Sequence, residues 1–274
     1  MIDAHVHFWE YEPVKDAWIA DHMAAIKGDF MPPDLEVELK LNEVNGCVAV
    51  QADQSENETK FLLAQAEQYP FIKGVVGWID FRSQQLPERL AFFADNNKLK
   101  GWRHIVQAEP KGFLNQSDFL RGISELEQYG HTYDILINQQ QLPEVIDFVW
   151  KFPEQKFVLD HIAKPAIANQ KKREEWAMGI ELLAQHKNVY CKVSGLVTEA
   201  DWNNWVYEDM IYYLETVFEH FGAHRLMFGS DWPVCTLATN YKNTKQIVET
   251  FAAQLTVEQQ RAIFETTAMR CYNL

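Results

Sequence analysis

Residues 2–8 read IDAHVHF, a short apolar run that carries two histidines, and no glycine-rich phosphate-binding loop follows it. Seven further apolar runs follow along the chain, each separated from the next by a polar loop and a stretch of helical periodicity. This alternation is typical of successive βα units and of a parallel sheet. The eight predicted strands span Ile2–Phe8, Cys47–Ala52, Lys73–Ile79, Leu99–Val106, Tyr133–Asn138, Phe157–His161, Val189–Ser194 and Leu226–Ser230.

The amphipathic stretches between these runs are predicted to be helices that cover the sheet. Two more helices, Asn240–Gln254 and Val257–Arg270, follow the eighth strand, and Thr256 with Gln259 resembles a capping box. An open doubly wound sheet shares the βα alternation, but eight units without a phosphate loop favour closure. We therefore predict an α/β fold: a (β/α)8 TIM barrel, one domain over residues 1–274, with an extra C-terminal helix.

Composition excludes several kinds of partner. The chain has 39 acidic and 25 basic residues, a net charge of -14, which repels a polyphosphate backbone, so we expect no nucleic-acid partner. The first residues lack a basic and apolar leader pattern, and no apolar run is long enough to span a bilayer. The four cysteines have no CxxC spacing, which favours packed, reduced thiols over a zinc cluster. We expect a cytoplasmic protein without a membrane partner.

Two histidines and one aspartate stand at predicted strand ends that meet when a barrel closes. His5 and His7 are two residues apart on the first strand, which points both imidazoles to one face, where they can bind one metal ion or one substrate oxygen. Asp231 directly follows the eighth strand and should face them. The alternatives are a shared polar strand face for the histidines and a turn or N-cap role for Asp231.

Further ionisable side chains follow other strands. His161 ends the sixth strand, Lys192 lies within the seventh, and Arg103 lies near the end of the fourth. A charged group is costly to bury without a partner, so Lys192 either faces the site or forms a core ion pair. The guanidinium of Arg103 suits a carbonyl or carboxylate oxygen, whereas His104 should point outward and pack.

Neutral polar and aromatic residues complete the predicted pocket. Gln51 and Asn138 end the second and fifth strands, and their amides suit the hydroxyl groups of a sugar. Trp9, Trp78 and Trp232 are candidates for apolar pocket walls, although tryptophans at strand ends also seal cores and loops.

Four motifs together resemble one known family. They are DAHVHFW at residues 3–9, DHIAKP at residues 160–165, KVSGL at residues 192–196 and FGSDWP at residues 228–233. They resemble the amidohydrolase-related, metal-dependent hydrolases, a TIM-barrel family of the amidohydrolase superfamily that contains sugar-acid lactonases. Gln51 with Glu58 and Thr59 is similar to that family's second-strand segment, and the L-fuconolactonase and L-rhamnonolactonase branch is most similar.

The resemblance implies hydrolysis of a cyclic ester of a sugar acid, such as an L-fucono-, L-rhamnono- or D-galactono-lactone. It implies active-site roles for His5, His7, His161 and Asp231. Dinuclear members of the superfamily carry a carboxylated lysine on the fourth strand and a histidine on the fifth, where this chain has Arg103 and Asn138. We therefore expect at most one metal ion.

Three imidazoles and one carboxylate suit zinc with a water in the open position. Because related lactonases work without tightly bound metal, the resemblance leaves the metal requirement open. We hypothesise that Asp231 takes a proton from water and later protonates the leaving ring oxygen, while Arg103, Lys192 and the histidines stabilise the oxyanion. The alternatives are a zinc-dependent nonoxidative decarboxylase and a non-catalytic sugar-acid binding protein.

Overall fold

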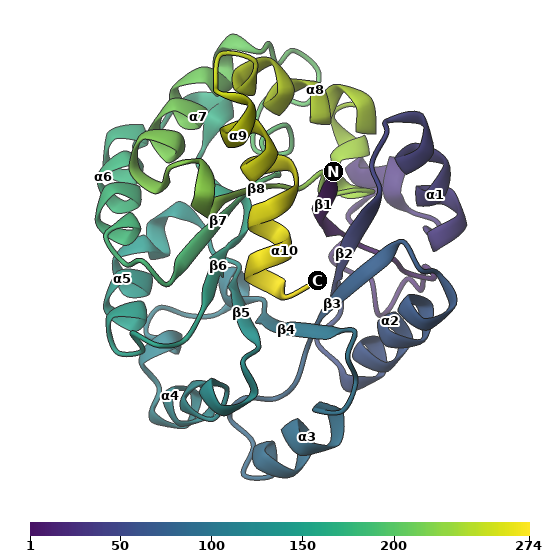
Figure 1. Cartoon of the computed structure of the whole chain (residues 1–274), viewed down its shortest axis with the longest axis vertical. Helices are drawn as coiled ribbons and strands as arrows, with labels where there is room; N and C mark the ends of the chain where they lie inside the picture. The colour runs from purple at the N-terminus through teal and green to yellow at the C-terminus, as the bar shows by residue number, and fades with distance from the viewer.

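The computed structural model, which describes residues 1–274, is an eight-stranded parallel barrel surrounded by helices (Figure 1). Every strand pairs in parallel with the next one along the chain. The predicted TIM barrel is confirmed. The strands are β1 (Ile2–Val6), β2 (Gly46–Val50), β3 (Ile72–Gly77), β4 (Leu99–His104), β5 (Thr132–Ile135), β6 (Phe157–Leu159), β7 (Val189–Val193) and β8 (Leu226–Phe228).

The barrel closes between β1 and the residues that follow β8. The His7 N–H donates to the Trp232 carbonyl at 2.7 Å, and the Asp231 N–H donates to the His5 carbonyl at 2.9 Å. Gly229 makes this approach possible, because a Cβ on it would lie 2.7 Å from the Cβ of His5. The closing hydrogen bonds therefore run through the residues that were predicted to form the site.

Ten α-helices accompany the strands. They are α1 (Pro32–Leu41), α2 (Glu56–Gln68), α3 (Leu86–Phe93), α4 (Ser117–Ser124), α5 (Leu142–Trp150), α6 (Arg173–Ala184), α7 (Glu208–Phe221), α8 (Tyr241–Ala252), α9 (Val257–Arg261) and α10 (Thr267–Tyr272). Thr256 and Gln259 form the predicted capping box at the start of α9. A π-helical turn, Ala262–Thr266, joins α9 to α10, so the predicted last helix is one irregular helix. None of these helices has the length and apolar character that a bilayer crossing requires.

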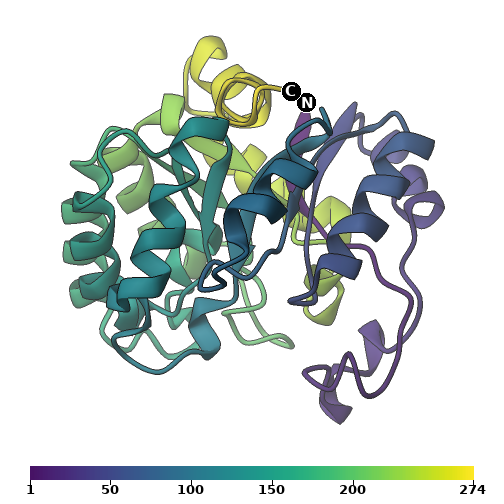
Figure 2. The ribbon, with the colours of Figure 1, turned by 90° about the horizontal axis from the view of Figure 1, so that it is seen from below.

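The two ends of the barrel differ. Helix α10 lies across the end at which the strands begin (Figures 1 and 2). There Ala268, Cys271 and Tyr272 pack against interior residues such as Ala4, Val48 and others in one small apolar cluster. The long segment between β1 and α1 lies at the opposite end, where the strands finish (Figure 2). Active sites of TIM barrels lie at that second end.

Several strands are shorter than predicted at their carboxyl ends. β5 stops at Ile135, β6 at Leu159 and β8 at Phe228, two to three residues before the predicted limits. Beyond these points the chain turns to present side chains to the site, and Asp231 adopts a left-handed φ of 59°. Local turn geometry of this kind has no signature in apolar periodicity.

A layer of buried ion pairs fills the barrel between the small apolar cluster under α10 and the carboxyl ends of the strands. Lys192 on β7 is fully buried, and its Nζ lies 2.6 Å from Oδ2 of Asp134 and 3.0 Å from Oδ1 of Asp160. Burial alone would lower the pKa of Lys192, but the two carboxylates outweigh it and hold the pKa above 10.5. Tyr272 of α10 donates to Asp134 Oδ2 at 2.6 Å, so the last helix contacts this layer directly.

Replacing Lys192→Met tests this layer. The variant leaves Asp134 buried without a cation and Asp160 with Arg103 alone, and we expect it to lower the free energy of unfolding by about 3–5 kcal/mol. Urea unfolding followed by circular dichroism measures the loss. Lys187→Met, on an exposed lysine, is the control, and Lys192→Met with Asp134→Asn should lose less than the single variant. A Lys192→Met protein as stable as the wild type contradicts the account.

His131 predicts a pH dependence of stability. Trp102 Nε1 donates to His131 Nδ1 at 3.1 Å, and burial lowers the pKa of His131 from 6.5 to about 4. The unfolded chain takes up the proton at higher pH than the folded chain, so stability is lost as the pH falls from 6.5 through 4. The contribution of this histidine is at most about 3 kcal/mol. His131→Gln should flatten the unfolding free energy over this interval relative to the exposed-site control His224→Gln, and equal slopes would refute the assignment.

Candidate active site

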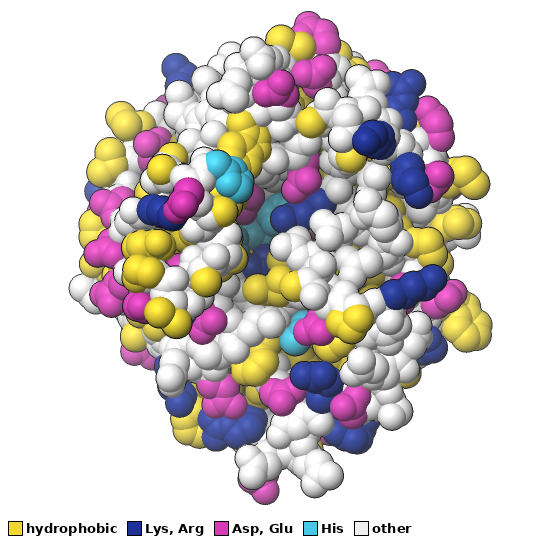
Figure 3. All heavy atoms as spheres, turned by 180° about the vertical axis from the view of Figure 1, so that it is seen from behind, with side chains coloured by type: hydrophobic (Ala, Val, Ile, Leu, Met, Phe, Trp, Pro, Cys, Tyr) yellow, Lys and Arg dark blue, Asp and Glu magenta, His cyan; other side chains and the backbone are white.

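A cavity of about 320 Å³ opens at the carboxyl end of the barrel. Figure 3 shows this end as a hollow with histidine and basic side chains at its floor. Its apolar wall consists of Trp9, Trp18, Ala52, Ile105, Ala108, Leu136 and Val234. Its polar lining consists of His7, Gln54, Arg103, Gln107, His161, Lys164 and Asp231. The volume lies in the range of small-molecule sites, about 300–1,000 Å³.

β1 supplies two imidazoles that face each other, as their spacing predicts. Nε2 of His5 lies 3.1 Å from Nε2 of His7. Nδ1 of His7 lies 2.7 Å from the carbonyl of Val50, an acceptor only, so Nδ1 carries the proton and Nε2 presents a lone pair. An extra residue in β1 relative to β2, between Asp3 and Val6, re-aims the side chains at this point.

The third imidazole follows β6. Nδ1 of His161 lies 2.9 Å from the hydroxyl of Ser194, which leaves Nε2 directed at the cavity. Gly195 permits this contact, because a Cβ on it would lie 2.8 Å from Nδ1 of His161. Burial lowers the pKa of His161 from 6.5 to about 4, and burial with the nearby Lys192 lowers the pKa of His5 well below 6.5. Both rings are therefore neutral at pH 7.

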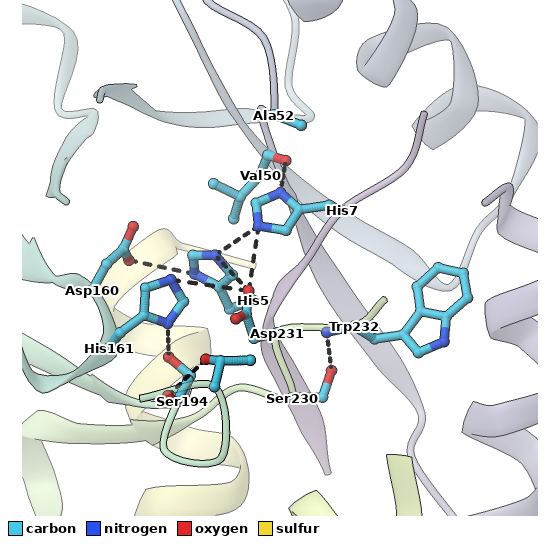
Figure 4. Close-up of polar contacts among 12 residues, drawn as sticks. His5, His7, Val50, Ala52, Asp160, His161, Ser194, Ser230, Asp231 and Trp232 are labelled. Atoms are coloured by element: carbon cyan, nitrogen blue, oxygen red, sulfur yellow. Dashed lines mark hydrogen bonds and ion pairs between the residues drawn. The ribbon is translucent and has the colours of Figure 1, made fainter. Parts of the chain in front are cut away.

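Asp231 lies where the three imidazoles converge (Figure 4). Its Oδ1 is 3.5 Å from Nε2 of His7, 3.8 Å from Nε2 of His5 and 3.9 Å from Nε2 of His161. Burial alone would raise the pKa of Asp231, but the imidazoles outweigh it and hold the pKa below its ordinary value of 3.8. The carboxylate is ionised at neutral pH and can accept a proton or bind a cation.

These donors fit one divalent metal ion. Ligand atoms of His5, His161 and Asp231 lie within 4.8 Å of one another, and His7 Nε2 lies beside them. Around tetrahedral zinc, ligand atoms are about 3.3 Å apart because each bond is about 2.0–2.1 Å. Two neutral imidazoles and a carboxylate in a buried setting are ligands that zinc prefers. The residues present can therefore hold the mononuclear site predicted from the sequence.

Arg103 lines the cavity floor, and both of its terminal nitrogens are engaged, whereas its Nε is buried without a hydrogen-bond partner. Nη1 donates to Asp160 Oδ2 at 2.9 Å, and Nη2 donates to the carbonyl and side-chain oxygens of Gln51. Gln51 Nε2 in turn donates to the Arg103 carbonyl at 3.2 Å. Gln51 is fully buried and does not line the cavity, so its predicted substrate contact is replaced by a role in fixing Arg103.

Lys192 corrects a second expectation. Its ammonium lies below the cavity, 3.1 Å from Nδ1 of His5 and within the ion-pair layer of Asp134 and Asp160. The core ion pair, the alternative weighed from the sequence, is what the structure contains. Lys192 contacts Nδ1 of His5 and does not line the cavity, a placement that favours a positioning role over that of an oxyanion donor.

Three further predicted pocket residues lie elsewhere. Asn138 is exposed, because β5 ends at Ile135 and the chain then turns to begin the helical segment that leads into α5. Trp78 directs its Nε1 to Nδ1 of His104, 3.2 Å away, and Trp232 packs against Phe8 and Phe30. His104 stacks on Phe113 outside the barrel interior, as its outward orientation predicts. Of the three predicted tryptophans, Trp9 lines the cavity.

Sequence reasoning missed several residues of the site. Asp134 and Asp160 stand within otherwise apolar strand ends, a signal that was available from charge placement alone. Ser194 shares a strand face with Lys192, yet its contact with His161 depends on the fold. Trp18, Gln54 and Lys164 lie in loops and Gln107 in a short 3-10 turn, where periodicity gives no indication of which side chains reach a cavity.

Comparison with known proteins assigns the family. The family model described as Amidohydrolase matches residues 2–274. The L-fucono-1,5-lactonase of Burkholderia multivorans is 38% identical over 100% of this chain and 96% of its own length. A crystal structure of an amidohydrolase from Burkholderia multivorans with bound zinc, also 38% identical, covers 100% of this chain and 99% of that chain with a TM-score of 0.95.

More distant structures share only the fold. A dihydroxybenzoic acid decarboxylase from a Polaromonas species, with bound manganese, superposes with a TM-score of 0.70 at 12% identity and covers 100% of this chain and 96% of its own. The match to the family model and the 38% identity over the whole chain decide the assignment. The chain belongs to the amidohydrolase family.

Proposed function

We propose that this protein hydrolyses the lactone of a sugar acid and opens the ring to the free acid. The observation that carries the proposal is the convergence of three imidazole Nε2 atoms on the ionised carboxylate of Asp231 at the floor of the cavity. A carboxylate beside neutral imidazoles can remove a proton from water. The Burkholderia multivorans relative, named an L-fucono-1,5-lactonase, favours L-fucono-1,5-lactone as the substrate.

The cavity suits a monosaccharide lactone. The amides of Gln54 and Gln107 can donate to and accept from ring hydroxyls, and Trp9 and Trp18 provide apolar surface for the carbon face of the ring. The floor carries the reacting groups, so a ring placed between the tryptophans and the floor presents its ester carbonyl to Asp231. The loop before α1, which contributes Trp18, forms part of the wall.

Asp231 takes a proton from water, and the hydroxide attacks the ester carbonyl carbon. Asp231 then returns the proton to the ring oxygen as the carbon–oxygen bond breaks. The histidines orient the carboxylate, and Lys192 and Asp160 hold His5 in place from behind. We assign a zinc ion to His5, His7, His161 and Asp231, and the crystal structure of the 38% identical amidohydrolase from Burkholderia multivorans contains bound zinc. Such an ion would lower the pKa of bound water and polarise the carbonyl.

The decarboxylase alternative is not favoured. The decarboxylase structure resembles this chain at 12% identity, which supports a shared fold, whereas the lactonase is 38% identical over the whole chain. A silent binding protein would need the same cavity without turnover, and an assay separates the two. Ligand-induced thermal stabilisation without ring opening would identify the binding protein.

The test offers the protein L-fucono-, L-rhamnono- and D-galactono-lactones. A pH indicator detects the acid that ring opening releases. We expect the wild type to open at least one of them, with L-fucono-1,5-lactone best. Asp231→Asn removes the group that accepts the proton and should lower kcat about 10²–10⁴-fold. Asp95→Asn, on an exposed aspartate, is the matched control. A wild type inactive on the whole panel, or a fully active Asp231→Asn variant, rejects the proposal.

A further inference from the structure

The segment after β6 has an unusual backbone. His161, Ile162, Ala163 and Lys164 are consecutive residues with left-handed φ values of 51°, 48°, 64° and 46°. Residues other than glycine rarely adopt this conformation in succession. Trp176 Nε1 stabilises the turn by donating to the Ile162 carbonyl at 2.8 Å, and the Lys164 N–H donates to the His161 carbonyl at 2.8 Å. A strained turn held by specific contacts is a mark of a functional segment.

The turn brings two side chains to one cavity. His161 and Lys164, three residues apart, both line it. Lys164 therefore lines the same cavity as His7, His161 and Asp231. Lys164 forms no part of the ion-pair layer that contains Lys192, Asp134 and Asp160.

The cations around the site differ in what they can still bind. Lys192 is enclosed by Asp134, Asp160 and His5, and Arg103 is engaged by Asp160 and Gln51. The side chain of Lys164 is 23% exposed, and its partner, Oε1 of Glu199, is 3.7 Å away, beyond hydrogen-bond distance. Nε of Arg103 also lacks a hydrogen-bond partner, but it is buried, whereas the N–H donors of the partly exposed Lys164 are open to a ligand.

The proposed reaction needs such a donor. The lactone is neutral, whereas the tetrahedral intermediate carries a negative charge on the former carbonyl oxygen, and the product is a carboxylate. On the basis of the proposed function, we propose that the Lys164 ammonium binds this oxygen, first as the oxyanion and then in the carboxylate of the ring-opened acid. Lys164 takes this role in place of Lys192. Its interaction strengthens as charge develops, which is what transition-state stabilisation requires.

The proton and bond changes balance without Lys164 giving up its proton. Water loses a proton to Asp231 and forms the new carbon–oxygen bond. The ring carbon–oxygen bond then breaks, and the leaving oxygen takes the proton from Asp231. The carboxylic acid formed releases its own proton to solvent, and Lys164 remains an ammonium throughout.

Glu199 is the anion that the substrate displaces. Burial raises the pKa of Glu199 above its ordinary value, although Lys164 acts in the opposite direction. The carboxylate is therefore poorly stabilised in the resting protein, and the long contact to Lys164 is easily exchanged for a closer one. A carboxylate or an oxyanion of the ligand supplies that closer contact.

Binding of two probes to the full-length protein tests the role of Lys164. L-Fuconate carries the product carboxylate, and 1,5-anhydro-L-fucitol has a similar ring without a carbonyl group. For Lys164→Met we expect the Kd of L-fuconate to rise about 10–100-fold. The Kd of 1,5-anhydro-L-fucitol should stay within about twofold. Lys164→Arg should restore part of the loss, Glu199→Gln should tighten L-fuconate binding, and Lys171→Met, on an exposed lysine, is the control.

Lactone turnover is measured on the same proteins, and kcat should fall more than KM rises in Lys164→Met. Unchanged L-fuconate binding in Lys164→Met, or an equal loss for both probes, overturns the role of Lys164. Weaker L-fuconate binding in Glu199→Gln overturns the exchange with Glu199. If the wild type neither opens a lactone nor binds L-fuconate, the proposed function fails and the role of Lys164 fails with it. If the wild type opens a lactone and binds L-fuconate, the results for the Lys164 variants test the role of Lys164 alone.

Discussion

Closure of the barrel between β1 and the end of β8 is the constraint on which the site depends. Two backbone hydrogen bonds make the closure, from His7 to Trp232 and from Asp231 to His5. The same residues carry the reacting groups, so the backbone contact that completes the fold also places the Asp231 carboxylate 3.5 Å from the His7 imidazole. The closure requires glycine at position 229, because a Cβ there would collide with His5. Fold and chemistry share one set of contacts.

The barrel interior supports this arrangement from below. The small apolar cluster lies under α10, and the ion-pair layer of Lys192, Asp134 and Asp160 lies next to it. This layer contacts Nδ1 of His5. Buried charges of this kind add little net stability compared with apolar packing, but removal of one partner is costly. In this protein the buried charges serve to hold neighbouring side chains in position. The layer fixes the orientation of His5 and, through Asp160, that of Arg103.

The barrel and the converging residues were predictable because both follow from periodicity. Eight apolar runs predict eight strands, and the two-residue spacing of His5 and His7 places both rings on one face. Asp231 follows from barrel closure. By contrast, Lys192 and Lys164 are both lysines near strand ends, and only the fold separates the buried ion pair from the residue that lines the cavity. The left-handed turn after β6 and the early end of β5, which removes Asn138 from the pocket, depend on local backbone geometry.

An anomalous-scattering map of zinc-soaked crystals of the wild-type protein tests the central claim most directly. The convergence of the imidazoles on Asp231 predicts one zinc peak, within about 2.0–2.2 Å of the Nε2 atoms of His5, His7 and His161 and of Oδ1 of Asp231. The peak should be absent from crystals of the Asp231→Asn and His161→Ala double variant soaked in the same way. Two peaks at the cavity floor, or a peak outside the reach of these ligands, would contradict the account.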